Sequence, residues 1–221
     1  MKINFEKAAP YIEALYQRDE TARNDFISAS AGRDFGMPVD SDVSRMMQLL
    51  IRLARPARVL EIGTSIGYST VAIARAAQEY GGRITTIEYD PGSARQAVKN
   101  FEAAGVAGLI EVKIGDAREI VPGLTGSFDL IFQDVGDKRL YPELLEALVK
   151  LLRPGGLLLA EDPLLPFIDL NLAEFPASER LEWENSKAAL QEFNQRVADC
   201  PELQSTLLPI GDGLTVAIKI G

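Results

Sequence analysis

Apolar positions recur at helical spacing in the segment 41–54. They follow the i, i+3, i+4, i+7, i+8, i+11 pattern of one helix face, at Val43, Met46, Met47, Leu50, Ile51 and Ala54. Ser41 or Asp42 can cap the start of such a helix, and Pro56 follows its end. The spacing therefore predicts an amphipathic helix whose apolar face, methionines included, packs into a core.

Short apolar runs alternate with further helical stretches after this segment. Five runs have the composition of strands, at 58–63, 83–90, 110–116, 128–134 and 156–162. Helical stretches lie between or after them, following Gly67, from Ser93 to Ala104, from Tyr141 to Leu152 and from about Asn185 to Ala198. This alternation predicts an α/β fold, with a mostly parallel sheet covered by helices on both faces.

The two ends of the chain and one internal segment depart from the alternation. Residues 205–220 contain two β-rich runs joined by Gly211-Asp212-Gly213, which predicts a C-terminal antiparallel hairpin completing a seven-stranded sheet. Residues 1–36 are expected to form an N-terminal helical extension. Residues 163–184 are expected to form a long insertion near the substrate site. Because the chain has 221 residues and shows no repeat or linker, we expect a single domain, 1–221.

Charge and cysteine content argue against several functional classes. The net charge of −9 disfavours a broad contact with nucleic acid or anionic lipid. Cys200 is the only cysteine, so an internal disulfide and a cysteine zinc site are excluded. The N-terminal residues lack the apolar core of a signal peptide, and no run approaches the length of a membrane span. These features predict a cytoplasmic protein that does not contact membranes.

The turn Gly63-Thr64-Ser65-Ile66-Gly67 matches two different motifs. Its G-x-S-x-G spacing is that of the nucleophile elbow in α/β-hydrolases. The chain contains no histidine, however, so a serine nucleophile would lack its usual imidazole base. A glycine turn that holds a nucleoside is the better interpretation.

Every strand predicted for the parallel part of the sheet ends in an acidic residue. These residues are Glu61, Glu88, Asp116, Asp134 and the pair Glu161-Asp162. Ligands of such sheets bind at the carboxyl ends of the strands. A pyrophosphate would be repelled by Glu61, whereas the sulfonium and ammonium of S-adenosylmethionine suit an acidic edge. Glu88 can then accept the ribose hydroxyls, and Ser69 can meet the cofactor's carboxylate.

Several further motifs extend this pattern over most of the chain from about Met37. They are Glu61-Ile62-Gly63, Gly67-Tyr68-Ser69-Thr70, "GDA" at 115–117, "FDLIFQD" at 128–134 with Lys138 and Tyr141, "RPGGLLLAED" at 153–162 and "LLPIGDGLTVAIK" at 207–219. Together they resemble the cation-dependent O-methyltransferases, the family of catechol and caffeoyl-CoA O-methyltransferases and their small bacterial relatives. The resemblance implies a Rossmann-like class I methyltransferase fold and a homodimer.

The resemblance also implies roles for individual residues. S-adenosylmethionine is expected to contact Val39, Glu61, Gly63, Thr64, Ser69, Glu88, Asp116, Ala117 and Asp134, with the segment Met37-Pro38-Val39 closing over it. A divalent metal, usually Mg²⁺ and alternatively Ca²⁺ or Mn²⁺, is expected on Asp134, Glu161 and Asp162. It would chelate two neighbouring hydroxyls of a catechol-like aromatic substrate. Lys138 is the expected base, acting with Asp134.

Two departures from the family pattern leave alternatives open. The family usually has D-x-D-K after the fourth strand, whereas "DVGDK" contains one more residue, which we expect a bulge at Gly136 to absorb. In one alternative Asp137 also binds the metal, and in another Lys138 points away from the substrate. Glu161-Asp162 also replaces the family's Asp-Asn pair, so a degenerate, metal-free site is an alternative. The competing functions are a tRNA hydroxyuridine O-methyltransferase and a non-catalytic S-adenosylmethionine-binding protein.

Overall fold

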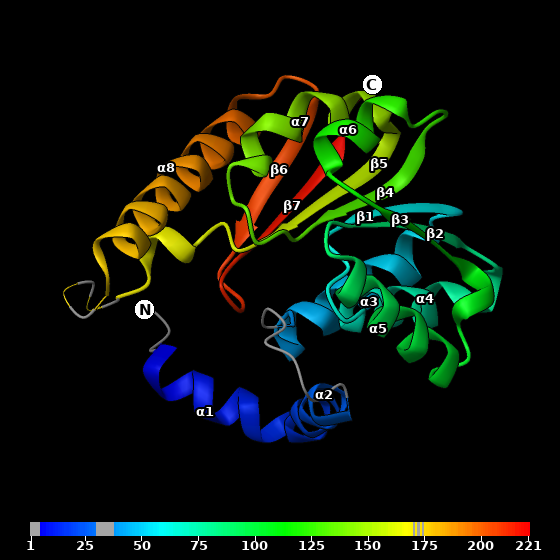
Figure 1. Cartoon of the computed structure of the whole chain (residues 1–221), viewed down its shortest axis with the longest axis horizontal. Helices are drawn as coiled ribbons and strands as arrows, with labels where there is room; N and C mark the ends of the chain where they lie inside the picture. Colours follow the sequence, from blue (N-terminus) through cyan, green and yellow to red (C-terminus); the bar gives the residue numbers. More distant parts are fainter. Residues whose placement is uncertain (1–4, 30–37, 170, 172, 174) are drawn as a thin grey trace. The chain divides into compact units, whose positions relative to one another are not determined.

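The computed structural model describes residues 5–29, 38–169, 171, 173 and 175–221. The chain divides into two compact units, Met1–Asp34 and Phe35–Gly221 (Figure 1). The first contains helices α1 (Phe5–Leu15) and α2 (Gln17–Ala29), within the stretch predicted to be helical. Met37, predicted to close over the cofactor, lies outside the described residues.

A seven-stranded sheet forms the centre of the Phe35–Gly221 unit (Figure 1). Its strands are β1 (Arg58–Ile62), β2 (Arg83–Glu88), β3 (Ile110–Ile114), β4 (Phe128–Gln133), β5 (Leu152–Glu161), β6 (Leu203–Leu208) and β7 (Leu214–Lys219). The spatial order is β3-β2-β1-β4-β5-β7-β6. Strands β1 to β5 are parallel, and β7 runs antiparallel to both β5 and β6. The predicted mostly parallel sheet with a C-terminal antiparallel hairpin is confirmed.

Helices cover both faces of this sheet. They are α3 (Ser41–Ala54), α4 (Tyr68–Ala77), α5 (Pro91–Ala103), α6 (Ala117–Ile120), α7 (Leu140–Leu151) and α8 (Ala177–Asp199). Short 3-10 helices are η1 (Gln78–Tyr80), η2 (Ala107–Leu109), η3 (Val121–Gly123) and η4 (Leu165–Phe167). Figure 1 shows α3, α4 and α5 on one face and α6, α7 and α8 on the other. Because central strands are covered on both sides, β4 is buried at nearly every position.

An extended apolar cluster lies between the sheet and the helices α7 and α8. Leu148 of α7 and Leu190 of α8 are fully buried there. The rings of Tyr141 and Phe193 pack edge to face, with centroids 5.3 Å apart. This packing holds the N-terminal end of α7, and with it the loop between β4 and α7, close to the sheet.

Some predicted boundaries were wrong. Asp40 occupies the N-cap position of α3, where Ser41 or Asp42 was expected. Residues 177–184, assigned to the insertion, form the first two turns of α8. These turns are almost entirely exposed, so they lack the apolar stripe that reveals a helix in a sequence.

No helix in the part of the chain that the structure describes combines the length and the apolar composition needed to cross a bilayer.

Candidate active site

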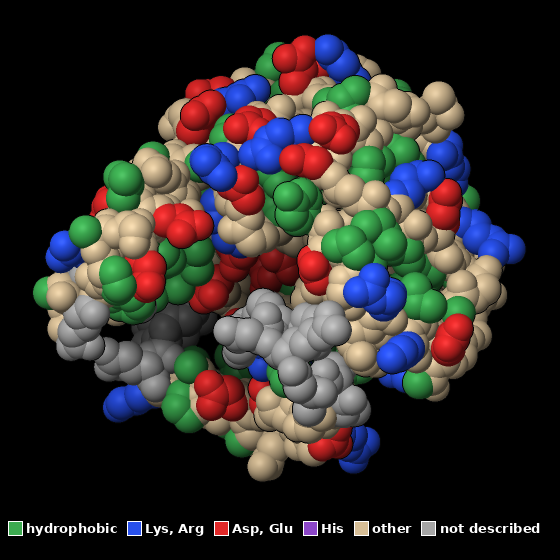
Figure 2. Space-filling model, in the orientation of Figure 1, with side chains coloured by type: hydrophobic (Ala, Val, Ile, Leu, Met, Phe, Trp, Pro, Cys, Tyr) green, Lys and Arg blue, Asp and Glu red, His purple; other side chains and the backbone are tan. Residues whose placement is uncertain are grey.

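The strand order reverses between β1 and β4, which places a ligand crevice at the carboxyl ends of these strands. The turn after β1 passes tightly over this point, because an ideal Cβ on Gly63 would lie 1.6 Å from the carbonyl oxygen of Asp134. The backbone N–H of Asp134 donates to the carbonyl of Ile62 at 2.9 Å. Acidic side chains gather toward the centre of the visible face (Figure 2). The fold therefore brings the acids that end β1 and β4 together.

The G-x-S-x-G turn links the ends of β1 and β2. Ser65 adopts a left-handed φ of 48°, and its backbone N–H donates to Glu88 Oε2 at 2.7 Å. Glu88 Oε1 accepts the N–H of Asp90 at 2.8 Å. Each carboxylate oxygen keeps a further lone pair, so the fixed and partly exposed Glu88 can still accept hydroxyl donors.

Glu61 is fully buried beneath this turn. Its carboxylate accepts hydrogen bonds from Ser69 Oγ at 2.7 Å, Thr70 Oγ1 at 2.5 Å and Thr86 Oγ1 at 2.6 Å. Thr64 Oγ1 lies 2.6 Å from Thr86 Oγ1 and continues the network. Burial raises the pKa of Glu61 to about 7. Glu61 thus ties the first turn of α4 to β1 and β2, a structural role that its position at a strand end did not reveal.

Replacing Glu61 with glutamine should flatten the pH dependence of stability. The pKa of Glu61 rises from 4.5 to about 7 on folding, so the folded state holds more protons between these values and stability falls as pH rises through this window. We expect urea unfolding of the unmodified protein to show a loss on the order of 2–3 kcal/mol between pH 4.5 and pH 7.5 that the variant lacks. Glu102→Gln, on the exposed surface of α5, is the matched control. A Glu61→Gln variant with the full pH dependence would contradict this assignment.

Asp116 and Ala117 lie at the end of β3. Asp116 caps α6, since its Oδ1 accepts the N–H of Arg118 at 2.8 Å, and its Oδ2 lies 3.2 Å from Arg118 Nη1. Both carboxylate oxygens of Asp116 therefore already bond to Arg118 in the helix that follows. Ala117 and Val39, also predicted cofactor contacts, are both buried. Tyr89, directly after Glu88, is 76% exposed at the end of β2, and the sequence analysis did not single it out.

Three carboxylates at the ends of β4 and β5 converge. Asp134, Glu161 and Asp162 each offer one oxygen, and these oxygens lie within 4.8 Å of one another. Burial, followed by the charge of the neighbouring carboxylates, raises the pKa of both Asp134 and Glu161. Oxygen ligands at this spacing suit a hard divalent cation, whose charge would offset their mutual repulsion. The donor set therefore fits a metal ion.

Lys138 reaches this carboxylate cluster from the loop between β4 and α7. Its Nζ forms an ion pair with Asp162 Oδ2 and donates to the carbonyl of Val135 at 2.7 Å. It also lies 5.4 Å from the centroid of the Tyr141 ring. The side chain is almost fully buried, so its position is set by packing as well as by charge.

Comparisons with known proteins show the family of this chain. The family model described as O-methyltransferase matches residues 7–220. The chain belongs to the O-methyltransferase family. A catechol O-methyltransferase of Niastella koreensis is 36% identical over 165 residues, which cover 72% of this chain and 73% of the relative. A catechol O-methyltransferase of Mycobacterium tuberculosis is 32% identical, with 69% of each chain covered.

Solved structures extend the likeness to the whole chain. The O-methyltransferase TomG of Streptomyces achromogenes, in complex with SAM, has a TM-score of 0.74 and 26% identity, covering 97% of this chain and 96% of its own. An O-methyltransferase of Bacillus cereus, in complex with SAH, has a TM-score of 0.75 and 26% identity over 95% and 96% of the two chains. The protein is an S-adenosylmethionine-dependent O-methyltransferase with the Rossmann-like fold.

The extra residue in this methyltransferase is not absorbed as predicted. Strand β4 ends at Gln133, so Gly136 lies in the following loop and forms no bulge within a strand. A loop accommodates the residue without breaking ladder hydrogen bonds, which is less costly than a bulge. Lys138 keeps its contact with Asp162, and Asp137 instead pairs with Arg118 and Arg139. The geometry thus supports neither a metal-sharing Asp137 nor a displaced lysine.

Proposed function

We propose that this O-methyltransferase transfers the methyl group of S-adenosylmethionine to one hydroxyl of a catechol-like small molecule, assisted by a divalent metal. The observation that carries the proposal is the placement of Lys138 Nζ among the carboxylates Asp134, Glu161 and Asp162. A candidate base and a candidate metal site therefore share one edge of the sheet. The relatives named catechol O-methyltransferase support this acceptor class.

Asp134, Glu161 and Asp162 would hold the metal. When bound, a divalent cation would make a neighbouring hydroxyl more acidic and would favour substrates with two adjacent hydroxyls. Glu161 ends β5 and Asp162 directly follows it. The N–H of Leu164 donates to the carbonyl of Asp212 at 2.9 Å, which ties the segment after Asp162 to the hairpin turn. The fold thus fixes this pair of ligands before any substrate arrives.

The cofactor is proposed to lie over β1 and β2. Gly63 and Thr64 shape the turn, Ser69 lies in the first turn of α4, and Glu88 offers its remaining lone pairs to the two ribose hydroxyls. The exposed ring of Tyr89 adds a flat apolar surface beside Glu88, suited to a purine. Val39, Asp116 and Ala117 remain predicted contacts.

Lys138 is proposed to accept the proton of the reacting hydroxyl at Nζ as a neutral amine, after its ammonium form has released a proton to solvent. The carbonyl of Val135 and the carboxylate of Asp162 direct this nitrogen toward the carboxylate cluster. The hydroxyl oxygen then forms a bond to the methyl carbon as the bond from that carbon to sulfur breaks. The protein's main contribution is proximity and orientation of the two reactants.

Charge at this edge favours a small acceptor over tRNA. Besides Asp134, Glu161 and Asp162, the hairpin turn contributes Asp212, whose pKa is raised by burial and then by the charge of Asp162. Nucleic-acid binding needs clustered Lys and Arg, whereas Arg118, Lys138 and Arg139 near this edge are each paired with a carboxylate. A homodimer and a cytoplasmic location rest on the family resemblance and on composition, and they stay predictions.

Metal removal is the decisive experiment. We expect the protein to methylate catechol in the presence of S-adenosylmethionine and Mg²⁺, and to lose about 100-fold or more of its turnover after EDTA treatment. Added Mg²⁺ should restore the rate. Phenol, with a single hydroxyl, serves as the control acceptor and should not be methylated at a comparable rate. Product formation is measured by chromatography.

Two results would reject parts of the proposal. Turnover of catechol that EDTA does not alter would reject the metal role. Methylation of tRNA that weakens steeply with salt, together with no methylation of catechol, would reject the acceptor class.

A further inference from the structure

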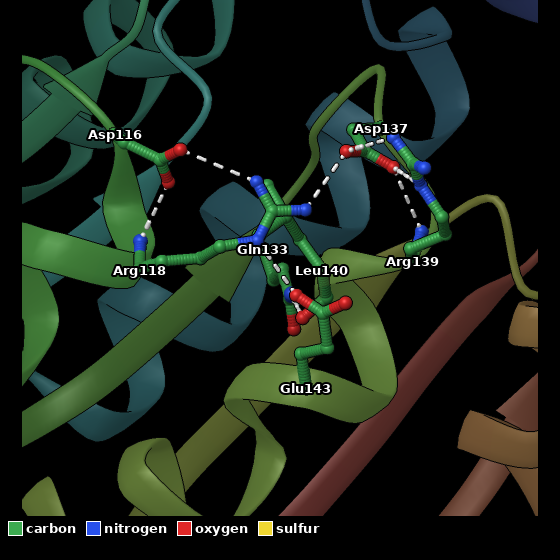
Figure 3. Close-up of polar contacts among 7 residues, drawn as sticks. All are labelled: Asp116, Arg118, Gln133, Asp137, Arg139, Leu140 and Glu143. Carbon is green, nitrogen blue, oxygen red and sulfur yellow. Dashed lines mark hydrogen bonds and ion pairs between the residues drawn. The ribbon is translucent and has the colours of Figure 1, made fainter.

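Arg118 joins three elements through one guanidinium group (Figure 3). It contacts a carboxylate from the turn before α6, one from the loop between β4 and α7, and one from α7 itself. The contacts are Nη1 to Asp116 Oδ2 at 3.2 Å, Nη2 to Asp137 Oδ2 at 3.0 Å and Nε to Glu143 Oε2 at 2.7 Å. This set of contacts, termed here the Arg118 clasp, connects segments far apart in the sequence.

The two sides of the clasp carry different parts of the proposed reaction. Asp116 precedes Ala117 on the proposed cofactor side. Asp137 directly precedes Lys138, in the loop that begins with Asp134. The clasp therefore spans from the cofactor side to the loop that holds the proposed base and a proposed metal ligand.

The loop is open to solvent at the extra residue. Gly136 is exposed, and an added Cβ there would have nothing within 4 Å. Asp137 next to it is held by Arg118 and by Arg139, whose Nε lies 2.8 Å from Asp137 Oδ1. The backbone N–H of Arg139 also donates to Asp137 Oδ1 at 3.2 Å. Asp137 thus anchors the loop directly after the extra residue.

The clasp is suited to fixing geometry more than to adding stability. Hydrogen bonds from Arg139 and Arg118 lower the pKa of Asp137 to about 2, so it is ionised at neutral pH. Partly exposed ion pairs contribute little to stability. A planar guanidinium, however, presents donors in fixed directions that an ammonium cannot reproduce. Its loss should therefore move the loop without unfolding the protein.

We propose that Arg118 is a positioning residue for methyl transfer, which holds Asp137 so that Lys138 and Asp134 keep their places beside the cofactor. This inference rests on the proposed function. Arg118 itself acts through Asp137, and its effect should fall on kcat more than on binding.

The test compares Arg118→Ala and Arg118→Lys with Arg139→Ala. Arg139 lies two residues from Asp137, so its ion pair stays within one segment and ties the loop to no other element. Arg139→Ala removes this local pair and leaves the contacts of Arg118 with Asp116, Asp137 and Glu143 intact. With catechol, Mg²⁺ and S-adenosylmethionine, both Arg118 variants should lose about 10- to 100-fold in kcat, while KM for catechol and the cofactor Kd change less than about threefold. Arg139→Ala should stay within about twofold of the unmodified enzyme in all three. The Asp137→Ala, Arg118→Ala double variant should be no slower than Arg118→Ala alone.

A second readout does not depend on turnover. Amide hydrogen exchange is measured in the presence of EDTA at Leu140, whose N–H donates to the carbonyl of Asp137 at 3.1 Å, and is expressed relative to the intrinsic rate for each sequence. Exchange there should quicken by about tenfold or more in the Arg118 variants and stay nearly unchanged in Arg139→Ala. This result stands even if catechol proves not to be the acceptor, so it separates failure of the clasp from failure of the proposed function.

Three results would overturn the inference. The first is an Arg118→Ala enzyme with unchanged kcat and unchanged exchange. The second is full activity in Arg118→Lys, which would mean that charge alone suffices. The third is a parallel loss of kcat, cofactor affinity and melting temperature, which would indicate a merely structural role.

Discussion

Replacing Lys138 with alanine should lower kcat for catechol by about 100- to 10,000-fold, the range that a positioned general base contributes. Lys138 is 9% exposed, and its Nζ is held at the carboxylate cluster by Asp162 and by the carbonyl of Val135. The chain has no histidine that could replace it. Cofactor affinity should change less than about threefold, because the proposed cofactor contacts lie over β1 and β2. Steady-state kinetics at saturating Mg²⁺ and calorimetric titration with S-adenosylmethionine measure the two effects.

The Lys138→Arg variant tests whether Lys138 acts as a base or only supplies a positive charge. Arginine keeps a cation beside Asp162 but cannot release its proton at neutral pH, so this variant should be as slow as the alanine variant. Lys150→Ala, which removes an exposed lysine paired with Glu146 on α7, is the surface control and should be fully active. Normal turnover in Lys138→Ala would show that another group takes the proton.

Gly63→Ala should destabilise the protein by more than about 4 kcal/mol, a loss typical of severe steric conflict in a core. An ideal Cβ there would lie 1.6 Å from the carbonyl oxygen of Asp134 and 2.7 Å from its carbonyl carbon. Both atoms are backbone, so relief requires β1 and β4 to move apart where their ends form the site. The φ of 97° adds strain for any residue with a Cβ. Urea unfolding gives the loss of stability.

Gly81→Ala is the matched control for the backbone strain alone. Gly81 has a φ of 76°, yet an added Cβ would meet nothing within 4 Å. This variant should lose only about 1–2 kcal/mol, the cost of a left-handed conformation in a residue with a Cβ. Equal losses in the two variants would show that the close approach of Gly63 to Asp134 is not the dominant cause.

Local pattern was sufficient for most of the secondary structure. The inner strands β1, β4 and β5 contain apolar runs because they are covered on both faces, whereas the edge strand β3 alternates apolar and charged residues. The hairpin is marked by its glycine turn. The start of α8 was missed because its first turns are exposed and polar. Helix-forming Glu, Arg and Leu at 179–182 were the signal available there.

The placement of the site at the strand ends followed from topology, whereas the partners of its side chains did not. Once parallel strands were assigned, Asp134 and the Glu161-Asp162 pair had to meet at one edge. That Glu61 is buried under three hydroxyls depends on how α4 packs against β1 and β2. The prediction of a bulge at Gly136 was wrong because one residue of length does not indicate whether a strand or a loop absorbs it.

By itself the sequence determined the αβ alternation, the terminal hairpin and the set of acids at one edge, because all three follow from local periodicity and the direction of parallel strands. Only the tertiary structure decided which carboxylates face one another and which are occupied. Asp137 pairs with Arg118 and Lys138 reaches Asp162, contacts that depend on the path of a loop and the packing of α7. The number of residues between two positions on different elements does not determine how far apart they lie in the fold. Sequence spacing therefore could not predict these contacts.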